Sequence, residues 1–218
     1  MAKRVECDPY RRITTFRMNG DRFDVGGCGP STLSFGSLTV RPETGLFDLS
    51  DLLPAELPPL DGLASLQTFA GKVVTLDLAK NRLSIEDVAD SSKTDKMVPL
   101  PIRVAHSAAG AGMDVFVRVE GSRGPLWFEL DSGNLDNVLV SNQVLDQLGL
   151  SQQKIDSLRD HKPTPIAIRV GGLGELKVTA ASKDLIFDGA LNAETLERLI
   201  VVLDLNAARG WASLGPGK

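Results

Sequence analysis

An internal repeat constrains the fold of this 218-residue chain more strongly than any other feature. Residues 60–83 align without gaps to residues 187–210, at a constant offset of 127 positions (187 minus 60). The identical pairs are Asp61/Asp188, Gly62/Gly189, Thr68/Thr195, Val74/Val201, Leu76/Leu203, Asp77/Asp204, Leu78/Leu205 and Arg82/Arg209. Two copies of one sequence pattern indicate two related units of structure.

The repeat extends to a helix start and to a second, upstream match. Ser65 and Asn192 occupy the same repeat position, and both residue types are favoured at the N-cap of a helix. Upstream, residues 25–29 match residues 170–174 at an offset of 145 (170 minus 25), so the first copy carries 18 more residues (145 minus 127). The extra residues fall around the proline-rich stretch 53–59.

Two strand-like segments lead into an acid in the second copy. Residues 115–120 alternate in hydrophobicity, residues 121–125 contain the glycine and proline typical of a turn, and residues 126–130 alternate again. Asp131 therefore ends a predicted hairpin, and Ser132 and Gly133 follow it. A residue without Cβ lets backbone donors approach the carboxylate closely.

This Asp131-Ser132-Gly133 motif and the repeat together resemble the retropepsin-like aspartic peptidases, in particular their two-lobed bacterial members. The resemblance implies an all-β fold with a few short helices, built as an acid-protease-like closed barrel with two related lobes. It implies an aspartic endopeptidase without a cofactor, which binds a polypeptide substrate. Asp131 would supply one catalytic carboxylate, Ser132 would hydrogen-bond to the other lobe's loop, and the Gly133 amide would orient the acid.

The chemistry of that family requires two carboxylates at close range. Two such groups cannot both ionise easily, so one keeps its proton at the working pH. The ionised group acts as general base on a shared water, while the protonated group polarises the scissile carbonyl.

Two glycine-rich segments are candidates for the substrate-covering flap of such an enzyme. Gly171, Gly172, Leu173 and Gly174 resemble that flap, and residues 26–29, with Gly26 and Gly27, would be the counterpart in the first lobe. Plain hairpin turns are the alternative interpretation. Neither segment matches a phosphate-binding loop, which needs a lysine followed by serine or threonine.

The second carboxylate is not visible in the sequence. In the second copy the acid precedes the glycine-rich segment by 40 residues (171 minus 131), and the same spacing from Gly26 falls before residue 1. Asp8 lies only 18 residues ahead of Gly26 (26 minus 8) and has no leading hairpin, so we do not expect it to be the partner. Either an N-terminal hairpin with its own motif is missing, or two chains form a homodimer in which each contributes Asp131.

A second departure concerns the hydrophobic-Leu-Gly element that is usual near the end of a lobe. Residues 61–65 read Asp-Gly-Leu-Ala-Ser and residues 188–192 read Asp-Gly-Ala-Leu-Asn. The alternative function is therefore a non-catalytic peptide-binding or scaffold module with a degenerate aspartic-protease fold. In either case, the recurring acids Asp61, Asp77, Asp188 and Asp204 are expected to form structural hydrogen bonds.

The expected organisation is a first lobe at residues 1–86 that is incomplete at its N-terminus, a polar linker at 87–97, and a second lobe at 98–218. Ser141 and Ser151 are expected to start helices that direct residues 144, 145 and 148, and residues 155 and 158, inward. Trp127 lies opposite the apolar face of its strand, where it would serve in a cleft, in an interface or in ordinary packing.

Composition narrows the partners and the compartment. A net charge of −4 argues against nucleic acid as the main partner, and no apolar run approaches the ~20 residues of a membrane span. The N-terminus lacks the apolar core of a signal peptide. The protein would be periplasmic or secreted if an upstream signal was removed, and cytoplasmic otherwise; Cys7 and Cys28 would be able to pair if the protein is exported.

The sequence gives little support to other hydrolytic chemistry. The chain has two histidines, His106 and His161, and neither has metal-ligand spacing around it, so no metal site is predicted. No Gly-x-Ser-x-Gly sequence is present to place a serine nucleophile.

Overall fold

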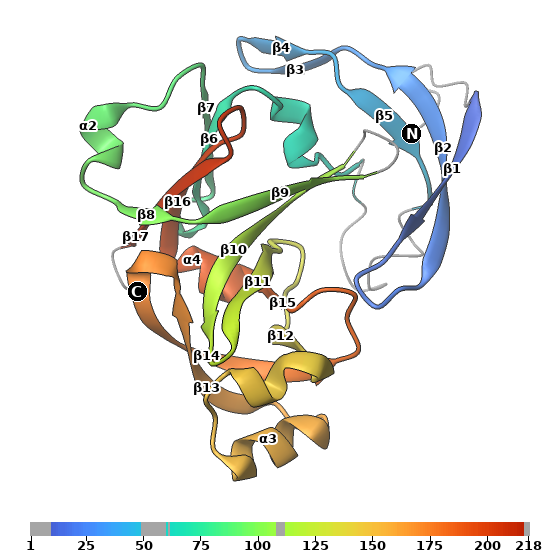
Figure 1. Cartoon of the computed structure of the whole chain (residues 1–218). Helices are drawn as coiled ribbons and strands as arrows, with labels where there is room; N and C mark the ends of the chain where they lie inside the picture. Colours follow the sequence, from blue (N-terminus) through green and yellow to red (C-terminus); the bar gives the residue numbers. More distant parts are fainter. Residues whose placement is uncertain (1–9, 49–59, 61, 108–111, 216–218) are drawn as a thin grey trace. The chain divides into compact units, whose positions relative to one another are not determined.

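The computed structural model describes residues 10–48, 60, 62–107 and 112–215 (Figure 1). About 50% of the chain is β-strand and the helices are few and short, as the sequence predicts. The chain divides into two compact units, each described separately. Unit 1 comprises Met1–Arg17, Asp21–Ala70 and His106–Asp114, and unit 2 comprises Met18–Gly20, Gly71–Ala105 and Val115–Lys218. The predicted lobe boundaries follow the sequence repeat and remain a prediction.

Unit 1 contains a three-stranded antiparallel sheet and a small hairpin. The sheet has the order β1-β2-β5, with β1 at Arg11–Phe16, β2 at Arg22–Pro30 and β5 at Glu43–Leu46. The hairpin joins β3 (Leu33–Phe35) to β4 (Leu38–Val40). The short 3₁₀ helix η2 (Leu66–Phe69) also belongs to this unit, and its Phe69 ring lies 5.3 Å from the ring of Phe35.

Unit 2 contains a closed six-stranded barrel (Figure 1). The sheet has the order β11-β15-β12-β14-β13-β10-β9, and pairing of β10 with β11 closes it. Its strands are β9 (Ile102–His106), β10 (Met113–Gly121), β11 (Gly124–Leu130), β12 (Val138–Ser141), β13 (Thr164–Val170), β14 (Gly174–Lys183) and β15 (Gly189–Leu191). The predicted hairpin of residues 115–130 is confirmed as β10 and β11.

Strand alternation explains which side chains fill the barrel. Val115, Val117 and Val119 of β10 and Leu126 and Phe128 of β11 are buried, while the residues between them face outward.

Strand β15 lies between β11 and β12, parallel to the first and antiparallel to the second. A Cβ at its first residue, Gly189, would lie 2.6 Å from the Leu139 carbonyl oxygen and from the Phe128 ring. Glycine is therefore required by close packing at this repeat position.

Short helices complete the connections of unit 2. They are η3 (Leu78–Lys80), α2 (Ser91–Thr94), η4 (Asn142–Gln147), α3 (Gln152–Arg159), η5 (Gly171–Leu173) and α4 (Ala193–Glu197). Ser141 and Ser151 stand at the N-caps of η4 and α3, as predicted, although only Ser141 accepts a capping hydrogen bond. The expected inward residues 144, 145, 155 and 158 are buried, and residue 148 is half-buried.

The second sheet of unit 2 brings the two repeat copies together. It has the order β7-β6-β16-β17-β8, with β6 at Val73–Asp77, β7 at Arg82–Glu86, β8 at Val98–Leu100, β16 at Leu199–Asp204 and β17 at Arg209–Leu214. The hairpins β6–β7 and β16–β17 are repeat copies of each other. Their turns have left-handed residues at the same repeat position, Asn81 (φ 50°) and Ala208 (φ 49°).

The register between β6 and β16 is symmetric about one residue pair. Thr75 lies opposite Val202, which is its own repeat counterpart (202 minus 75 is 127). On either side, Val74 pairs with Leu203 and Leu76 pairs with Val201. The antiparallel pairing therefore relates the two hairpins by a local two-fold axis.

The predicted glycine loop at Gly26 and Gly27 is wrong as a loop. Both residues lie inside β2, where Gly27 pairs with Arg11 of β1 and Gly45 of β5. A Cβ at Gly27 would lie 2.7 Å from Arg11 Cγ, so this glycine makes room for a cross-strand side chain. The other segment does form a hairpin tip, because η5 connects β13 to β14.

Candidate functional site

Asp131 is held at the end of the parallel strand pair β11–β15. Its backbone N–H donates to the Leu191 carbonyl oxygen at 3.0 Å, which extends the pairing one residue beyond β11. The chain then continues through residues 132–137 to β12, which lies on the other side of β15. The loop that carries the motif therefore passes across the end of β15.

Hydrogen bonds tie this loop to the start of α4. The Asn192 side chain is buried at 2% exposure, and its Nδ2 donates to the Asp136 carbonyl oxygen. The Ala193 amide donates to the Asn134 carbonyl oxygen at 2.9 Å, and Asn134 Nδ2 donates to the Asn137 carbonyl oxygen at 3.0 Å. The helix start that follows β15 thus fixes the loop that follows β11.

The Asp131 carboxylate accepts two backbone amides from its own loop. The amides of Gly133 and Asn134 donate to Oδ1 at 3.0 and 3.1 Å. A Cβ at Gly133 would lie 3.3 Å from the same oxygen, a tight contact, so the predicted close approach of this glycine to the carboxylate is observed. The sequence did not identify Asn134 as a partner, although asparagine and aspartate side chains commonly bond the backbone of such turns.

Burial of the Asp131 side chain raises the pKa of its carboxyl above its ordinary value of 3.8. The hydrogen bonds from the Gly133 and Asn134 amides stabilise the ionised form and oppose this rise. No other carboxylate of the described residues contributes to the shift. Asp131 is therefore a partly buried acid that favours its protonated form more than an exposed aspartate does.

The structure does not give Ser132 a partner within the part of the chain that it describes. This residue is exposed, and its hydroxyl makes no hydrogen bond with any described residue. The motif thus brings together Asp131, Gly133 and Asn134, while Ser132 stands outside that network.

The glycine-rich tip of the β13–β14 hairpin packs against β8. A Cβ at Gly171 would lie 3.1 Å from Leu100 Cδ1, and a Cβ at Gly172 would lie 3.0 Å from Val98 Cγ1. In this structure the tip is therefore in contact with a strand. The role of residues 171–174 as a flap remains a prediction.

The recurring acids have structural partners, as the sequence predicts. Asp188 Oδ2 accepts the Trp127 amide at 2.8 Å, which ties the β15 region to β11. Asp204 accepts the Ala207 amide at 2.9 Å and pairs with Arg209 at 3.1 Å. Asp77 pairs with Lys80 at 2.8 Å, whereas Asp61 and Cys7 lie outside the described residues.

Each histidine makes a local hydrogen-bond contact. His106 Nδ1 lies 3.0 Å from Gln67 Oε1, and His161 Nδ1 lies 3.4 Å from the Ser182 carbonyl oxygen. Within the described ranges, no three His, Cys, Asp or Glu side chains gather closely enough to hold a metal ion. No described helix combines the length and the apolar character needed to cross a membrane.

A scan against protein-family models and a search of curated proteins both found no match for this chain. The function of the chain is therefore inferred from the residues of the site and from the chemistry they permit.

Proposed function

We propose that the protein is an aspartic endopeptidase and that Asp131 is one carboxylate of its catalytic dyad. One observation carries the proposal. A partly buried carboxylate with a raised pKa is fixed by the Gly133 and Asn134 amides on a loop that crosses the end of β15. The resemblance of Asp131-Ser132-Gly133 to the retropepsin-like peptidases gives this acid its role.

The environment of Asp131 suits an acid that shares a proton with a second carboxylate. Burial favours its neutral form, and a negative charge nearby would raise its pKa further. The amides on Oδ1 leave Oδ2 without a described hydrogen-bond partner. That oxygen is the one we propose to face the attacking water or the scissile carbonyl.

The sheet register bears on the source of the second carboxylate. Strand β16 pairs with β6 on one edge and with β17 on the other, so neither edge is open to a second chain. Strand β6 of the first repeat pairs with β16 symmetrically about Thr75 and Val202. It therefore occupies the position beside β16 that the β16 strand of a second chain would take in a symmetric dimer. We therefore do not expect a second chain to supply its Asp131 by pairing with this sheet.

A non-catalytic peptide-binding module is the second candidate. It is favoured by the unpartnered Ser132 and by the finding that no other carboxylate of the described residues shifts the pKa of Asp131. A non-catalytic turn in which an aspartate side chain accepts backbone amides of the same turn would have the same local geometry. The two candidates differ in whether the Asp131 charge matters for turnover.

Cleavage of an unfolded protein at acidic pH tests the proposal. Asp131→Asn keeps the side-chain shape and the Oδ1 acceptor but removes the acid, so kcat/KM should fall by about 10²–10⁴-fold. Asp136→Asn is the matched control, because Asp136 is exposed on the same loop, and it should cleave at the wild-type rate. Equal cleavage by wild type and Asp131→Asn, or no cleavage by a folded wild type, would favour the binding module.

A further inference from the structure

A hollow of about 350 Å³ opens on the outer face of β9, β10 and β11, within unit 2. Three aromatic side chains line it, from Phe116, Trp127 and Phe187, together with Arg103, Val104 and Ala105 of β9 and with Asp188. Its volume falls at the lower end of the range for small binding sites. Of its lining residues, Asp188 has the structural role described above, because it accepts the Trp127 amide.

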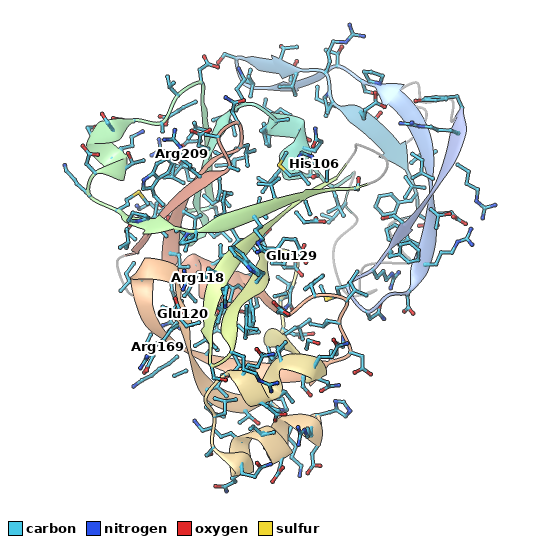
Figure 2. The ribbon with its side chains drawn as sticks, in the orientation of Figure 1. His106, Arg118, Glu120, Glu129, Arg169 and Arg209 are labelled. Carbon is cyan, nitrogen blue, oxygen red and sulfur yellow. The ribbon has the colours of Figure 1, made fainter. Side chains whose placement is uncertain are left out.

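The strand register places the hollow beside the motif acid. Phe116 of β10 lies opposite Glu129 of β11, which is labelled in Figure 2. Side chains alternate along a strand, so Trp127, Glu129 and Asp131 leave β11 on the same outward side. Glu129 precedes Asp131 by two residues, or about 7 Å of extended chain.

The aromatic walls are held in place by specific contacts. The Phe116 and Phe187 rings meet edge to face with their centroids 5.4 Å apart. The Trp127 backbone amide donates to the side chain of Asp188, the residue after Phe187. This bond ties the two aromatic segments together, so the hollow is pre-formed.

Arg103 gives the hollow a positive group. Its guanidinium carbon lies 4.1 Å from the centroid of the Trp127 ring, a cation–π stack. Arg103 forms no ion pair with any carboxylate of the described residues. Stacking limits the motion of a planar group whose N–H donors match a carboxylate, so an incoming acid would meet a partly ordered partner.

The edge of the sheet suggests that the occupant is an extended polypeptide. Among the described strands β9 is terminal in the seven-stranded sheet, and a terminal strand can pair with a peptide through its backbone. Arg103, Val104 and Ala105 of β9 all line the hollow, and Arg103 and Ala105 leave the strand on the same side. A peptide side chain opposite Ala105 would reach over this small residue to Phe116, while one opposite Arg103 would meet the guanidinium.

We propose that this hollow binds a polypeptide segment in which a bulky apolar residue and an acidic residue are two positions apart. The segment adds to the edge of β9, its apolar side chain enters between Phe116, Trp127 and Phe187, and its carboxylate pairs with Arg103. This inference rests on the proposed function, because the bound segment would belong to the polypeptide substrate that is presented to Asp131.

Tryptophan fluorescence tests the site without requiring catalysis. The chain has two tryptophans, so Trp211→Phe leaves Trp127 as the reporter. The probe is the acetylated and amidated peptide Gly-Asp-Thr-Phe-Thr-Gly, compared with versions in which its Asp is Asn or its Phe is Gly. The acidic peptide should change Trp127 emission and bind about 10-fold more tightly than either comparison peptide.

Protein variants then assign the preference to one side chain. In the same background Arg103→Gln should bind the acidic and neutral peptides equally. Arg123→Gln is the matched control, since Arg123 is exposed in the β10–β11 turn, and it should keep the preference. Equal binding of the acidic and neutral peptides by the Trp211→Phe protein, or no response of Trp127, would overturn the inference.

The test also separates this inference from the proposed function. Asp131→Asn should retain the preference for the acidic peptide, because Asp131 does not line the hollow. Peptide preference without protein cleavage would contradict the proposed function and leave the binding site standing. Cleavage without preference would contradict the binding site alone.

Discussion

The Asp131 carboxylate experiences two opposing effects. A carboxylate that accepts backbone amides is usually more acidic than a free one, yet burial of this side chain outweighs the amides of Gly133 and Asn134 and raises its pKa. Keeping this side chain ionised at neutral pH therefore lowers the stability of the folded protein. Residues that lower stability in this way are frequent at functional sites.

The stability of the protein should carry the signature of this raised pKa. Since the folded-state pKa of Asp131 lies above the unfolded value, its contribution is most favourable below its ordinary pKa of 3.8 and is lost as pH rises through the raised value. Asp131→Asn should therefore raise the melting temperature at neutral pH. Below that ordinary pKa the two proteins should melt nearly alike, as measured by calorimetry.

The exposed Asp136 on the same loop provides the control for this measurement. Asp136→Asn should leave the melting temperature nearly unchanged at both pH values, because surface changes of this kind have small effects. An Asp131→Asn protein that is less stable than wild type at neutral pH would show that the carboxylate stabilises the fold.

The close approach of Gly133 to the Asp131 carboxylate was readable from the sequence, because a residue without Cβ follows the acid. The partnership with Asn134 was not, since the three-letter motif ends before it. Gly26 and Gly27 show the converse problem. Glycine marks both turns and places of close packing, and only the pairing of β2 with β1 and β5 decides between them.

At the scale of elements, the helix starts at Ser65 and Asn192 share a repeat position, but their side chains hydrogen-bond to different parts of the chain. Ser65 Oγ accepts the amides of Gln67 and Met113 at 3.2 and 2.8 Å. Asn192 Oδ1 accepts the Thr195 amide and hydroxyl at 3.1 and 2.6 Å, and its Nδ2 also bonds the motif loop. Both predicted N-caps are confirmed, and the second one also supports the site.

Alanine substitutions should separate the contribution of each N-cap to stability from the contribution of Asn192 to the motif loop. Ser65→Ala should lower the free energy of unfolding by about 1 kcal/mol, the usual cost of a lost N-cap. Asn192→Ala should cost about 2–3 kcal/mol, because it leaves buried polar groups of the loop and helix without partners. Only Asn192→Ala should also reduce cleavage, since it frees the loop that carries Asp131.

Urea unfolding and the cleavage assay measure the two effects in parallel. Asn192→Asp is the informative companion, since it retains the cap acceptor and removes the donor to the Asp136 carbonyl oxygen. If Ser65→Ala proved the more damaging substitution, the assignment of Asn192 as an anchor of the motif loop would be wrong.

The strands of the second half were predictable because alternation marks them, as in β10 and β11. The pairing between these strands was harder to predict from the sequence. Phe128 of β11 pairs with Gly189 of β15, 61 residues away (189 minus 128), and no local pattern indicates that contact. The aromatic hollow depends on the same long-range contact, since it brings Phe187 to Phe116. Of the three aromatic residues of the hollow, the sequence singles out only Trp127, and it leaves open whether this residue serves in a cleft, in an interface or in packing.

At the scale of the whole molecule, the repeat accounts for the central pairing of the second sheet. Each copy supplies a hairpin, and the hairpins meet about Thr75 and Val202. A chain that satisfies this two-fold pairing internally does not need a second copy to complete the sheet.

The dependence of activity on concentration should reflect this internal pairing. Cleavage rate should be proportional to chain concentration, because the β6–β7 hairpin already fills the place in the sheet that a second chain would take, and sedimentation should show a monomer under the assay conditions. A site assembled from two Asp131 residues would instead lose specific activity on dilution. A rate that grows as the square of chain concentration would contradict the monomeric account.

The most direct test of the central claim, that Asp131 acts on the reacting atoms, is calorimetric binding of a pepstatin-like inhibitor. The inhibitor's central hydroxyl replaces the attacking water, so it should contact the catalytic carboxylate. Wild type should bind it more tightly than the analogue lacking that hydroxyl, and Asp131→Asn should lose the difference. Equal binding of both compounds by wild type would contradict the claim and leave a peptide-binding module.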